Sequence, residues 1–373
     1  MLEIKLPIRL RISVLSLGGQ LKNTVCFAQG RRAYLSPENG NLEAPENFIR
    51  FEKVVRRFLK EKPRVISYDM HPGYVSSQFA LALDKGRFSL CPVQHHHAHI
   101  ASCMADCGLK NEKVIACAFD GTGFGGDGTI WGGEFLLSDY QGFQRVGYLK
   151  PVPLVGAEAA IRQPWRLAFF WLEEIFGKKL WQKKLALFKR ISRRDWELLR
   201  RLPRLNFNSP LTSSAGRLFD AVASIILGQP EADYEASLAI ELERLANGFC
   251  EKSQGYPFDF IFKDGCFIID SGPIFRNIVK DLEQNLDRRS IAYSFHLSVA
   301  KMIQRGCLFL SKKTGIKKIV LSGGVFQNRL LTKMVKDLLS KQRLSLLLSQ
   351  RVSCNDSGIS LGQAVIAGIK GRA

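Results

Sequence analysis

Residues 93–135, VQHHHAHIASCMADCGLKNEKVIACAFDGTGFGGDGTIWGGEF, decide how the rest of the chain is interpreted. His95, His96, His97 and His99 are four of the six histidines of the chain. The small and apolar residues over 98–105 predict a helix, and residues four positions apart share one face of a helix. His95 and His99 therefore project together, which supplies half of a typical zinc or iron site. A solvated turn or a capped helix start can show the same spacing, so the histidines alone leave these alternatives open.

The second half of this stretch is an apolar strand that ends in an acidic residue and a glycine-rich turn. Asp120 follows the strand, and Gly121, Thr122 and Gly123 begin the turn. The backbone of a glycine-rich turn approaches a phosphate closely, so we predict that these three turn residues contact a nucleotide. A histidine pair and such a turn within forty residues together predict a metal and phosphate site.

Composition excludes several classes of protein. The chain has 373 residues, of which 46% are hydrophobic, enough for substantial cores. No apolar run approaches twenty residues, and the N-terminus is too interrupted by charge for a signal peptide. Nine scattered cysteines without a CxxC pair are typical of a reducing compartment. We therefore expect a cytoplasmic protein without a membrane partner.

The formal net charge of +20 raises the question of a polyanionic partner. Much of the excess lies over residues 162–204. One interpretation is a solvated basic face on a helical region. Its buried side chains would then be Trp181, Leu185, Leu187, Phe188 and Ile191. The other interpretation is a docking surface for an acidic protein or a nucleic acid.

The order three strands, helix, strand, helix occurs twice along the chain. The first unit has strands over 12–19, 20–29 and 31–36, a helix over 46–60, a strand over 64–69 and a helix after Pro72. A strand over 88–94 then leads into the histidine helix. The second unit has strands over 114–121, 129–139 and 143–150. After a long interruption it continues with helices over 294–314, 328–341 and 355–370, and with strands over 317–324 and 343–349.

This repeat predicts an α/β fold of two tandem βββαβα subdomains that face each other across a cleft. We expect the first subdomain over 1–111 and the second over 112–373, with a mostly helical insertion at about 151–295. A hairpin around Asp264 and Gly265 should interrupt that insertion. The arrangement resembles the actin-like ATPase superfamily (ASKHA). Each unit would touch phosphate through its first hairpin turn, which makes Lys22 and Asn23 candidate phosphate contacts.

Two motifs near the C-terminus carry further chemistry. Gly323 and Gly324 follow a strand, and Asn328 lies near the start of a helix. Strand, paired glycines and helix N-terminus together make an anion or nucleotide site, although an ordinary tight turn has the same pattern. Asp356 precedes the closing helix. It either caps that helix or joins His95, His99 and Asp120 as a metal ligand.

The insertion carries a second nucleotide candidate, SSAGRLFDAVASIILG over residues 213–228. Its small-residue turn contains Gly216, and the amphipathic helix after it carries Asp220. Acidic residues beside a nucleotide often accept hydrogen bonds from ribose hydroxyls. Asp220 is therefore either a ribose contact or an ordinary charge on the surface of a helix.

Long motifs spread over nearly the whole chain resemble the C-terminal carbamoyltransferase domain of the HypF family. These motifs are VQHHHAHIASCMADCGL, AFDGTGFGGDGTIWGGEF, RQPWR, SSAGRLFDAVA, YEASLAIELE, LSGGVFQNRLL and NDSGISLGQA, with LKNT, GNLE and DMHPGYVSS nearer the N-terminus. A looser resemblance connects the chain to the tRNA threonylcarbamoyladenosine synthase TsaD and to antibiotic O-carbamoyltransferases. The HHHAH run and the WGGEF segment favour HypF.

The HypF resemblance implies an enzyme that moves a carbamoyl group from carbamoyl-adenylate, itself made with ATP. The acceptor in that family is the C-terminal cysteine thiolate of HypE, in the synthesis of the cyanide ligands of NiFe-hydrogenases. One divalent metal, iron or zinc, would be bound by His95, His99, Asp120 and Asp356. The nucleotide would contact Gly216, Asp220, Gly323, Gly324 and Asn328, and also Lys22 and Asn23.

The chain departs from the HypF pattern in ways that affect its expected partners. A complete HypF also has an acylphosphatase-like domain, cysteine-rich zinc motifs and a YrdC-like domain that makes carbamoyl-adenylate. We expect a separate YrdC-like adenylating portion, with this chain a split HypF, a fragment or a paralogue. GNLE stands for the usual GDLE, and Asp356-Ser357-Gly358 for the usual DGG. Alternatives are a tRNA-modifying or small-molecule carbamoyltransferase of the TsaD type, and a non-catalytic ATP-binding scaffold.

Overall fold

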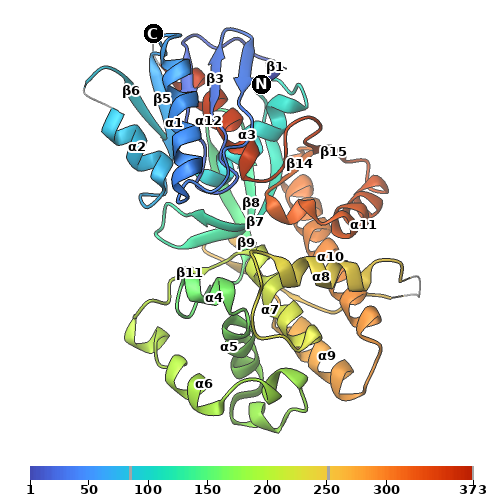
Figure 1. Cartoon of the computed structure of the whole chain (residues 1–373). Coiled ribbons are helices and arrows are strands. Elements are labelled where there is room, and N and C mark those ends of the chain that lie inside the picture. Colours follow the sequence, from blue (N-terminus) through green and yellow to red (C-terminus); the bar gives the residue numbers. More distant parts are fainter. Residues whose placement is uncertain (84–85, 250–252, 372–373) are drawn as a thin grey trace.

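The computed structural model describes residues 1–83, 86–249 and 253–371. Figure 1 shows two β-sheets, with the N-terminal sheet at the top and a large helical region below the second sheet. A pair of helices, α3 (His95–Asp106) and α12 (Ile359–Lys370), lies between the two sheets. This central pair carries two of the segments that the sequence assigns to the functional site.

The first sheet begins with an antiparallel meander and continues with parallel strands. Within the described residues its spatial order is β1-β4-β3-β2-β5-β6. Strands β2, β3 and β4 are antiparallel, and β5 and β6 run parallel to β2. The bounds are β1 Leu2–Lys5, β2 Val14–Ser16, β3 Cys26–Gln29, β4 Arg32–Leu35, α1 Pro45–Leu59, β5 Val65–Asp69, α2 Val75–Leu83 and β6 Ser89–Val93. The predicted elements are confirmed, and β1 is an additional edge strand.

The second sheet repeats the same topology. Its path β9-β8-β7-β14-β15 matches β4-β3-β2-β5-β6, with the same antiparallel and parallel pairings. The bounds are β7 Val114–Phe124, β8 Ile130–Ser138, β9 Phe143–Leu149, β14 Lys318–Ser322, η4 Gly324–Gln327, α11 Arg329–Ser340, β15 Ser345–Leu348 and η5 Asp356–Gly358. The two predicted βββαβα units are therefore present. The predicted division at residues 111 and 112 stays a prediction.

The central helices are exchanged between the units. Helix α3 ends the first unit but packs on β7, β8 and β14, whereas α12 ends the second unit but packs on β2, β3 and β5. Small residues permit this arrangement, because a methyl group at Gly362 would lie 1.8 Å from the carbonyl oxygen of Ala98. The exchange joins the two units through a shared hydrophobic layer.

Alternation along the strands gives each sheet two apolar faces. In β7, Val114, Ala116 and Ala118 face the layer of α3 and α12. Ile115, Cys117 and Phe119 belong to the core on the opposite face, which contains α10 (Arg288–Thr314). A strand buried on both faces reads as a continuous apolar run, which is why VIACAF was recognisable.

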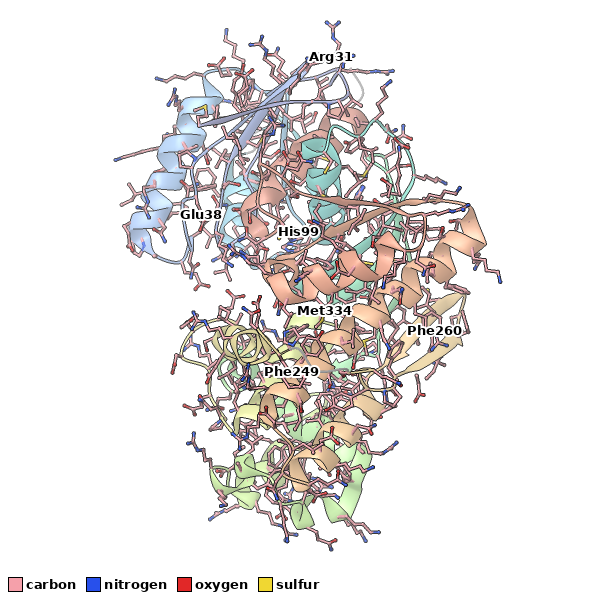
Figure 2. All side chains as sticks on the ribbon, turned by 90° about the vertical axis from the view of Figure 1, so that its right-hand side faces the viewer. Arg31, Glu38, His99, Phe249, Phe260 and Met334 are labelled. Atoms are coloured by element: carbon pink, nitrogen blue, oxygen red, sulfur yellow. The ribbon has the colours of Figure 1, made fainter. Side chains whose placement is uncertain are left out.

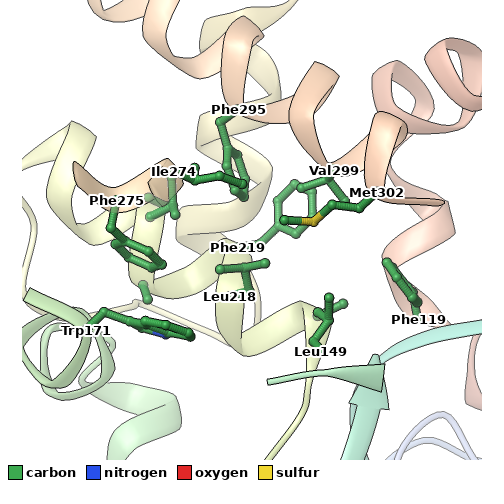
Figure 3. Close-up of a cluster of buried hydrophobic side chains, with 14 of the residues drawn as sticks. Phe119, Leu149, Trp171, Leu218, Phe219, Ile274, Phe275, Phe295, Val299 and Met302 are labelled. Carbon is green, nitrogen blue, oxygen red and sulfur yellow. The ribbon is translucent and has the colours of Figure 1, made fainter. Parts of the chain in front are cut away.

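A hydrophobic core of aliphatic and aromatic side chains joins the second sheet to the helices of the insertion (Figure 3). Phe219 packs edge-on against Phe295 with ring centroids 4.9 Å apart, and Trp171 stacks on Phe275 at 5.1 Å. The elements of this region are β10 Val152–Pro153, α4 Glu158–Arg162, α5 Trp165–Phe176, η1 Gly177–Gln182, η2 Ala186–Lys189, α6 Arg193–Leu199, η3 Pro203–Leu205, β11 Leu211–Thr212, α7 Ala215–Leu227, α8 Ser237–Ala246 and α9 Gly272–Glu283.

The basic segment forms less regular helix than its periodicity suggests. Between α5 and α6 the chain makes only the short turns η1 and η2, and α6 has seven residues. The apolar side chains predicted to face inward do so: Leu185, Leu187 and Ile191 are buried, and Trp181 and Phe188 pack on Phe169. Hydrophobic spacing therefore identified the inward-facing side chains, of which Trp181 and Phe188 are only partly buried, without fixing the backbone conformation.

The predicted hairpin in the insertion is confirmed. Strands β12 (Asp259–Lys263) and β13 (Cys266–Asp270) pair in antiparallel fashion, and β13 adds to the sheet beside β9. The turn residues Asp264 and Gly265 have φ angles of 50° and 79°. Positive φ at both central residues is the requirement of a type I′ turn, which Asp-Gly satisfies.

Two expectations drawn from composition concern helices and thiols. In the part of the chain that the structure describes, no helix is both long enough and apolar enough to cross a membrane. The described cysteines are free thiols, and Cys250 lies outside the described residues.

Candidate active site

A β-bulge places Asp120 at the centre of the candidate site. In the β7–β8 pair, Phe119 lies opposite Gly133 and Gly123 opposite Trp131, so residues 120–122 face Gly132 alone. Such an excess of residues bends the strand and redirects a side chain. Here the redirected carboxylate points toward α3, so the site depends on this irregularity of the strand.

Helix α3 presents His95 and His99 to this carboxylate. The helix begins at His95, earlier than the sequence suggested, because the Gln94 side chain accepts a hydrogen bond from the His97 backbone N–H. Both Nε2 atoms lie 3.2 Å from Oδ2 of Asp120. Figure 2 shows His99 in the middle of the molecule, and both histidines are buried.

Asp356 completes the group from the other end of the chain. Its Oδ1 atom lies 3.7 Å from Nε2 of His95 and 3.5 Å from Nε2 of His99. The alternative role of Asp356 as a cap is not seen, because the side chain of Asn355 accepts the bond from the Ser357 backbone N–H. Residues from α3, β7 and η5 thus converge on one point.

The donor atoms of this group fit a divalent metal. Those of His95, His99, Asp120 and Asp356 lie within 4.8 Å of one another. Ligands about 2.1 Å from a tetrahedral zinc lie about 3.4 Å apart, close to the 3.2–3.7 Å observed here. Two imidazoles and two carboxylates also suit iron, so the donor set does not select between the two metals.

Further contacts hold two of these side chains in orientation. Nδ1 of His95 donates to Oδ2 of Asp69 across 2.7 Å, which orients the ring and directs its Nε2 toward Asp120. Asp69 ends strand β5 and is fully buried. Oδ1 of Asp120 accepts the backbone N–H of Gly324 across 2.8 Å, which directs Oδ2 toward the histidines.

The pKa values of the group reflect this concentration of charge. Burial alone lowers the pKa of His95, but Asp69, Asp120 and Asp356 raise it well above its ordinary value. Burial raises the pKa of Asp120, yet hydrogen bonds from His95 and His99 bring it well below its usual range. The carboxylates are therefore ionised at neutral pH, as metal ligands need to be.

Glycines near the four candidate metal ligands leave room for the histidine rings, in addition to letting the backbone approach a ligand. A methyl group at Gly123 would lie 2.3 Å from Cε1 of His96 and 2.9 Å from Cδ2 of His95. The lack of a side chain at Gly123 thus makes room for imidazole rings. Its predicted contact with a nucleotide, like that of Thr122, stays a prediction.

The paired glycines after β14 lie directly against the bulge. Gly323 has a φ of 108°, and a methyl group there would lie 2.2 Å from the carbonyl oxygen of Phe119. Asn328 caps α11 by accepting the Leu331 N–H, and its Nδ2 donates to Nε2 of His296. The side chain of Asn328 therefore already has local partners, and its predicted nucleotide contact would have to replace one of them.

The motif of the insertion reaches the other side of the bulge. The Ser214 hydroxyl lies 2.7 Å from the carbonyl oxygens of both Asp120 and Gly121. A methyl group at Gly216 would lie 2.9 Å from Cα of Gly121, so the start of α7 and the turn are in close contact. The predicted nucleotide residues Gly121 and Gly216 are thus neighbours.

Asp220 forms a buried ion pair instead of a surface charge. Its Oδ2 lies 2.9 Å from Nη1 of Arg217, and both side chains are 3% exposed. The guanidinium and the carboxylate are not oriented to form a hydrogen bond with each other. Nε and Nη1 of Arg217 and Oδ2 of Asp220 therefore have no hydrogen-bond partner within the described residues. Nη2 of Arg217 lies 3.1 Å from where a methyl group on Gly121 would be.

Lys22 and Asn23, the predicted ligand contacts of the first hairpin turn, have different surroundings. The Nδ2 group of Asn23 donates to the carbonyl oxygens of Leu17 and Gly19, and its Oδ1 accepts from Asn39. Asn23 therefore shapes the turn from within. Lys22 has a left-handed backbone with a φ of 48°. The Lys22 side chain makes no hydrogen bond or ion pair within the described residues, and its contact with a ligand stays a prediction.

Sequence reasoning missed several side chains around the site. Asp69 and Tyr74 lie in the DMHPGYVSS motif, and His71 stacks on Tyr74 with ring centroids 4.2 Å apart. An acidic residue that ends an apolar strand was a usable signal for Asp69. Glu134 of the WGGEF segment is buried and pairs with Arg145 at 2.6 Å, which supports the turn after β7.

Comparisons with known proteins show the family of the chain. The family model described as "HypF Kae1-like domain" matches residues 10–106. The family model described as "Carbamoyltransferase, Kae1-like Domain, second subdomain" matches residues 116–363. Carbamoyltransferase HypF of Rhodobacter capsulatus is 34% identical over 96% of this chain and 47% of its own length. A carbamoyltransferase HypF homolog of Cupriavidus necator is 33% identical over 95% of this chain and 91% of its own.

A solved structure is also similar. Full-length HypF in the phosphate- and nucleotide-bound form superposes with a TM-score of 0.92 and 37% identity, over 100% of this chain and 48% of that one. This chain thus spans about half the length of most of the curated relatives it matches.

Proposed function

The chain belongs to the HypF family, and from this premise we propose that it transfers a carbamoyl group from carbamoyl-adenylate to a protein thiolate. The acceptor in this proposal is the C-terminal cysteine of a HypE-like protein in the maturation of NiFe-hydrogenases. The single observation that carries the proposal is the convergence of His95, His99, Asp120 and Asp356 beside glycine turns.

A divalent metal held by these four side chains would act as a Lewis acid on the carbamoyl carbonyl. In the reaction the thiolate of the acceptor forms a bond to the carbamoyl carbon. The bond from that carbon to the phosphate oxygen breaks, and AMP leaves with the bonding electrons. The nucleophile belongs to the acceptor, so no cysteine of this chain is needed.

The residues of the chain would bind and orient the donor. The bulge at residues 120–122 and the turn at Gly323 and Gly324 bring backbone close to one place, where a phosphate would lie. Arg217 supports this proposal, because Nη2 of its buried guanidinium lies beside Gly121, and its Nε and Nη1 have no hydrogen-bond partner within the described residues. A guanidinium is suited to bind the phosphate in two places at once.

The proposal includes the setting of the enzyme. We propose that it acts in the cytoplasm and receives carbamoyl-adenylate from a YrdC-like adenylating portion. The boundaries 1–111 and 112–373, with an insertion over 151–295, are part of the same proposal. The relatives named HypF support the separate adenylating portion, because this chain corresponds to about half of their length.

The test is carbamoyl transfer from supplied carbamoyl-adenylate to a HypE-like protein, read as the mass of the acceptor. The native chain should add one carbamoyl group at the terminal cysteine of the acceptor. His95→Ala and Asp356→Ala should each abolish the gain, while a control at Asp195, on the exposed face of α6, should not. An active Asp356→Ala variant would exclude the proposed role of the metal group.

A second candidate function is modification of tRNA, which the net charge of +20 favours. Lys178, Lys179, Lys189, Arg190, Arg194 and Arg204 are exposed on the basic segment. Binding to tRNA should then weaken steeply as salt rises, and mutation of these residues should reduce the slope. Carbamoyl transfer to a HypE-like protein without any tRNA binding would exclude this candidate.

A further inference from the structure

The edge strand β12 is apolar and exposed. It is the terminal strand of the second sheet, and it pairs on one side with β13. Ile261 is 46% and Phe262 is 61% exposed, and these are neighbours in one strand. Other exposed large apolar side chains on the described strands, Leu2 and Leu211, are isolated from each other. Figure 2 shows Phe260, from the same strand, at the outer edge of the molecule.

The register of the hairpin determines which backbone groups face outward. A two-residue turn connects Lys263 to Cys266, and Ile261 lies opposite Ile268. Residues next to a two-residue turn form a hydrogen-bonded pair, and such pairs alternate along the ladder. The N–H and C=O groups of Ile261 therefore point toward β13. Those of Phe260 and Phe262 point away from the sheet.

The sequence of β12, DFIFK, is complementary to itself when it is reversed. If two copies pair in antiparallel fashion about Ile261, Asp259 of one lies opposite Lys263 of the other. Phe260 then lies opposite Phe262, and the two Ile261 side chains meet. Asp259 and Lys263 are exposed, and neither has an ion-pair partner within the described residues.

The alternation of inward-pointing and outward-pointing backbone groups along β12 agrees with this pairing. When the pair is centred on Ile261, the two Ile261 residues form a non-hydrogen-bonded pair. This is required, because the backbone groups of Ile261 already point toward β13. Phe260 and Phe262 then exchange hydrogen bonds with Phe262 and Phe260 of the second copy. Charge, aromatic side chains and backbone groups therefore select the same register.

We propose that two copies of this chain associate through β12, forming an antiparallel pair centred on Ile261 that joins their sheets. The contact is two-fold symmetric, so each copy supplies the same surface. One face brings together Phe260 and Phe262 of both copies beside Phe309, which already contacts both rings within each copy. The other face forms two ion pairs between Asp259 and Lys263.

The strength of this association follows from its small size. A strand of five residues offers an interface at or below about 1,200 Å², the low end for specific complexes. The dimer should therefore dissociate at concentrations in the micromolar range. The proposal is independent of the proposed carbamoyl transfer, because residues 259–263 contribute nothing to the metal group.

Reversing a charge tests the ion pairs. Lys263→Glu places a second carboxylate opposite that of Asp259 in each half of the contact, so the dissociation constant should rise about tenfold or more. Combining Asp259→Lys with Lys263→Asp exchanges the charges and should restore the dimer. Sedimentation equilibrium on the full chain would measure both variants, with circular dichroism as the control for folding.

A cysteine at the symmetry axis tests the register. In Ile261→Cys the two thiols face each other at a non-hydrogen-bonded position, where Cα atoms lie about 4.5 Å apart. Mild oxidation should therefore cross-link this variant, and Ile268→Cys on the neighbouring strand should cross-link no faster than the native chain. A native chain that is monomeric up to about 100 μM would overturn the proposal. So would equal cross-linking of the two variants, as expected if another partner covers β12.

Discussion

Asp69 shows how a residue outside the ligand group determines the chemistry of the site. Its carboxylate accepts the Nδ1 proton of His95 across 2.7 Å, in a place where neither side chain is exposed. This bond fixes both the tautomer and the direction of the imidazole. Outer partners of this kind typically decide how tightly a metal is held.

We predict that Asp69→Asn weakens metal affinity by roughly 10- to 100-fold while leaving the fold intact. The amide is uncharged, so it makes His95 a poorer ligand. Competition with a chromogenic zinc chelator would measure the change. Asp106→Asn is the matched control, because Asp106 is a buried carboxylate of α3 that binds the backbone over residues 350–352 instead. Equal losses in the two variants would contradict the prediction.

The buried imidazole of His296 makes the stability of the protein depend on pH. Burial lowers its pKa to about 4, below the value of about 6.5 expected in the unfolded chain. The unfolded state therefore binds the proton first. The contribution of neutral His296 to the free energy of unfolding is complete above about pH 6.5. It is lost as the pH falls toward 4, by about 1.4 kcal/mol per pH unit.

His296→Gln should reduce this pH dependence. Glutamine supplies a donor for the carbonyl of Ala292 and an acceptor for Asn328, as His296 does, but it does not titrate. Urea unfolding at pH 7 and pH 5 would measure the difference. His97, with a pKa also lowered to about 4 by burial, should keep its own share of the slope. An unchanged slope in the variant would show that His296 does not contribute.

At the scale of elements, the exchanged helices α3 and α12 hold the two sheets together. They approach closely at Gly362, where a methyl group would meet the backbone of α3. The metal group begins at the N-terminus of α3, and Asp356 lies just before α12. Packing between these helices therefore positions ligands that are far apart in the sequence.

We predict that Gly362→Ala destabilises the protein by about 3 kcal/mol, because the added methyl group overlaps the Ala98 carbonyl. The same substitution should lower metal affinity, since it separates α12 from α3. Thermal unfolding and metal titration would measure both effects. Gly142→Ala is the control, because no described atom beyond its own and the two adjacent residues lies within 4 Å of the added methyl group. A native-like melting temperature for Gly362→Ala would contradict this account of the helix pair.

At the scale of the whole molecule, the proposed metal would link segments of both units. His95 and His99 come from the helix that ends the first unit, and Asp120 and Asp356 from the second. A ligand that binds only the folded state stabilises it by mass action. Folding and metal binding should therefore be coupled across the two sheets.

We predict that zinc or iron(II) at about 100 times its dissociation constant stabilises the protein by about 2.7 kcal/mol. The melting temperature should rise on addition of metal and return when a chelator is added. Asp356→Ala should remove this shift while leaving the metal-free melting temperature nearly unchanged. A shift that persists in the variant would place the metal elsewhere.

The local patterns of the sequence carried most of the fold. Apolar runs such as VIACAF marked strands buried on both faces, and Asp264-Gly265 marked a hairpin turn, because both depend on neighbours in sequence. Periodicity failed in the basic segment, where the chain forms short turns around correctly predicted buried side chains.

The sequence by itself determined the elements, their order in two repeated units and the shared face of His95 and His99, since each follows from residues within one or two turns. Only the tertiary structure decided that Asp356 meets these histidines, that Asp69 orients His95 and that Asp120 leaves its ladder to reach them. These contacts join distant segments through the exchange of α3 and α12. That exchange is selected by packing across two sheets, which no local pattern of residues encodes.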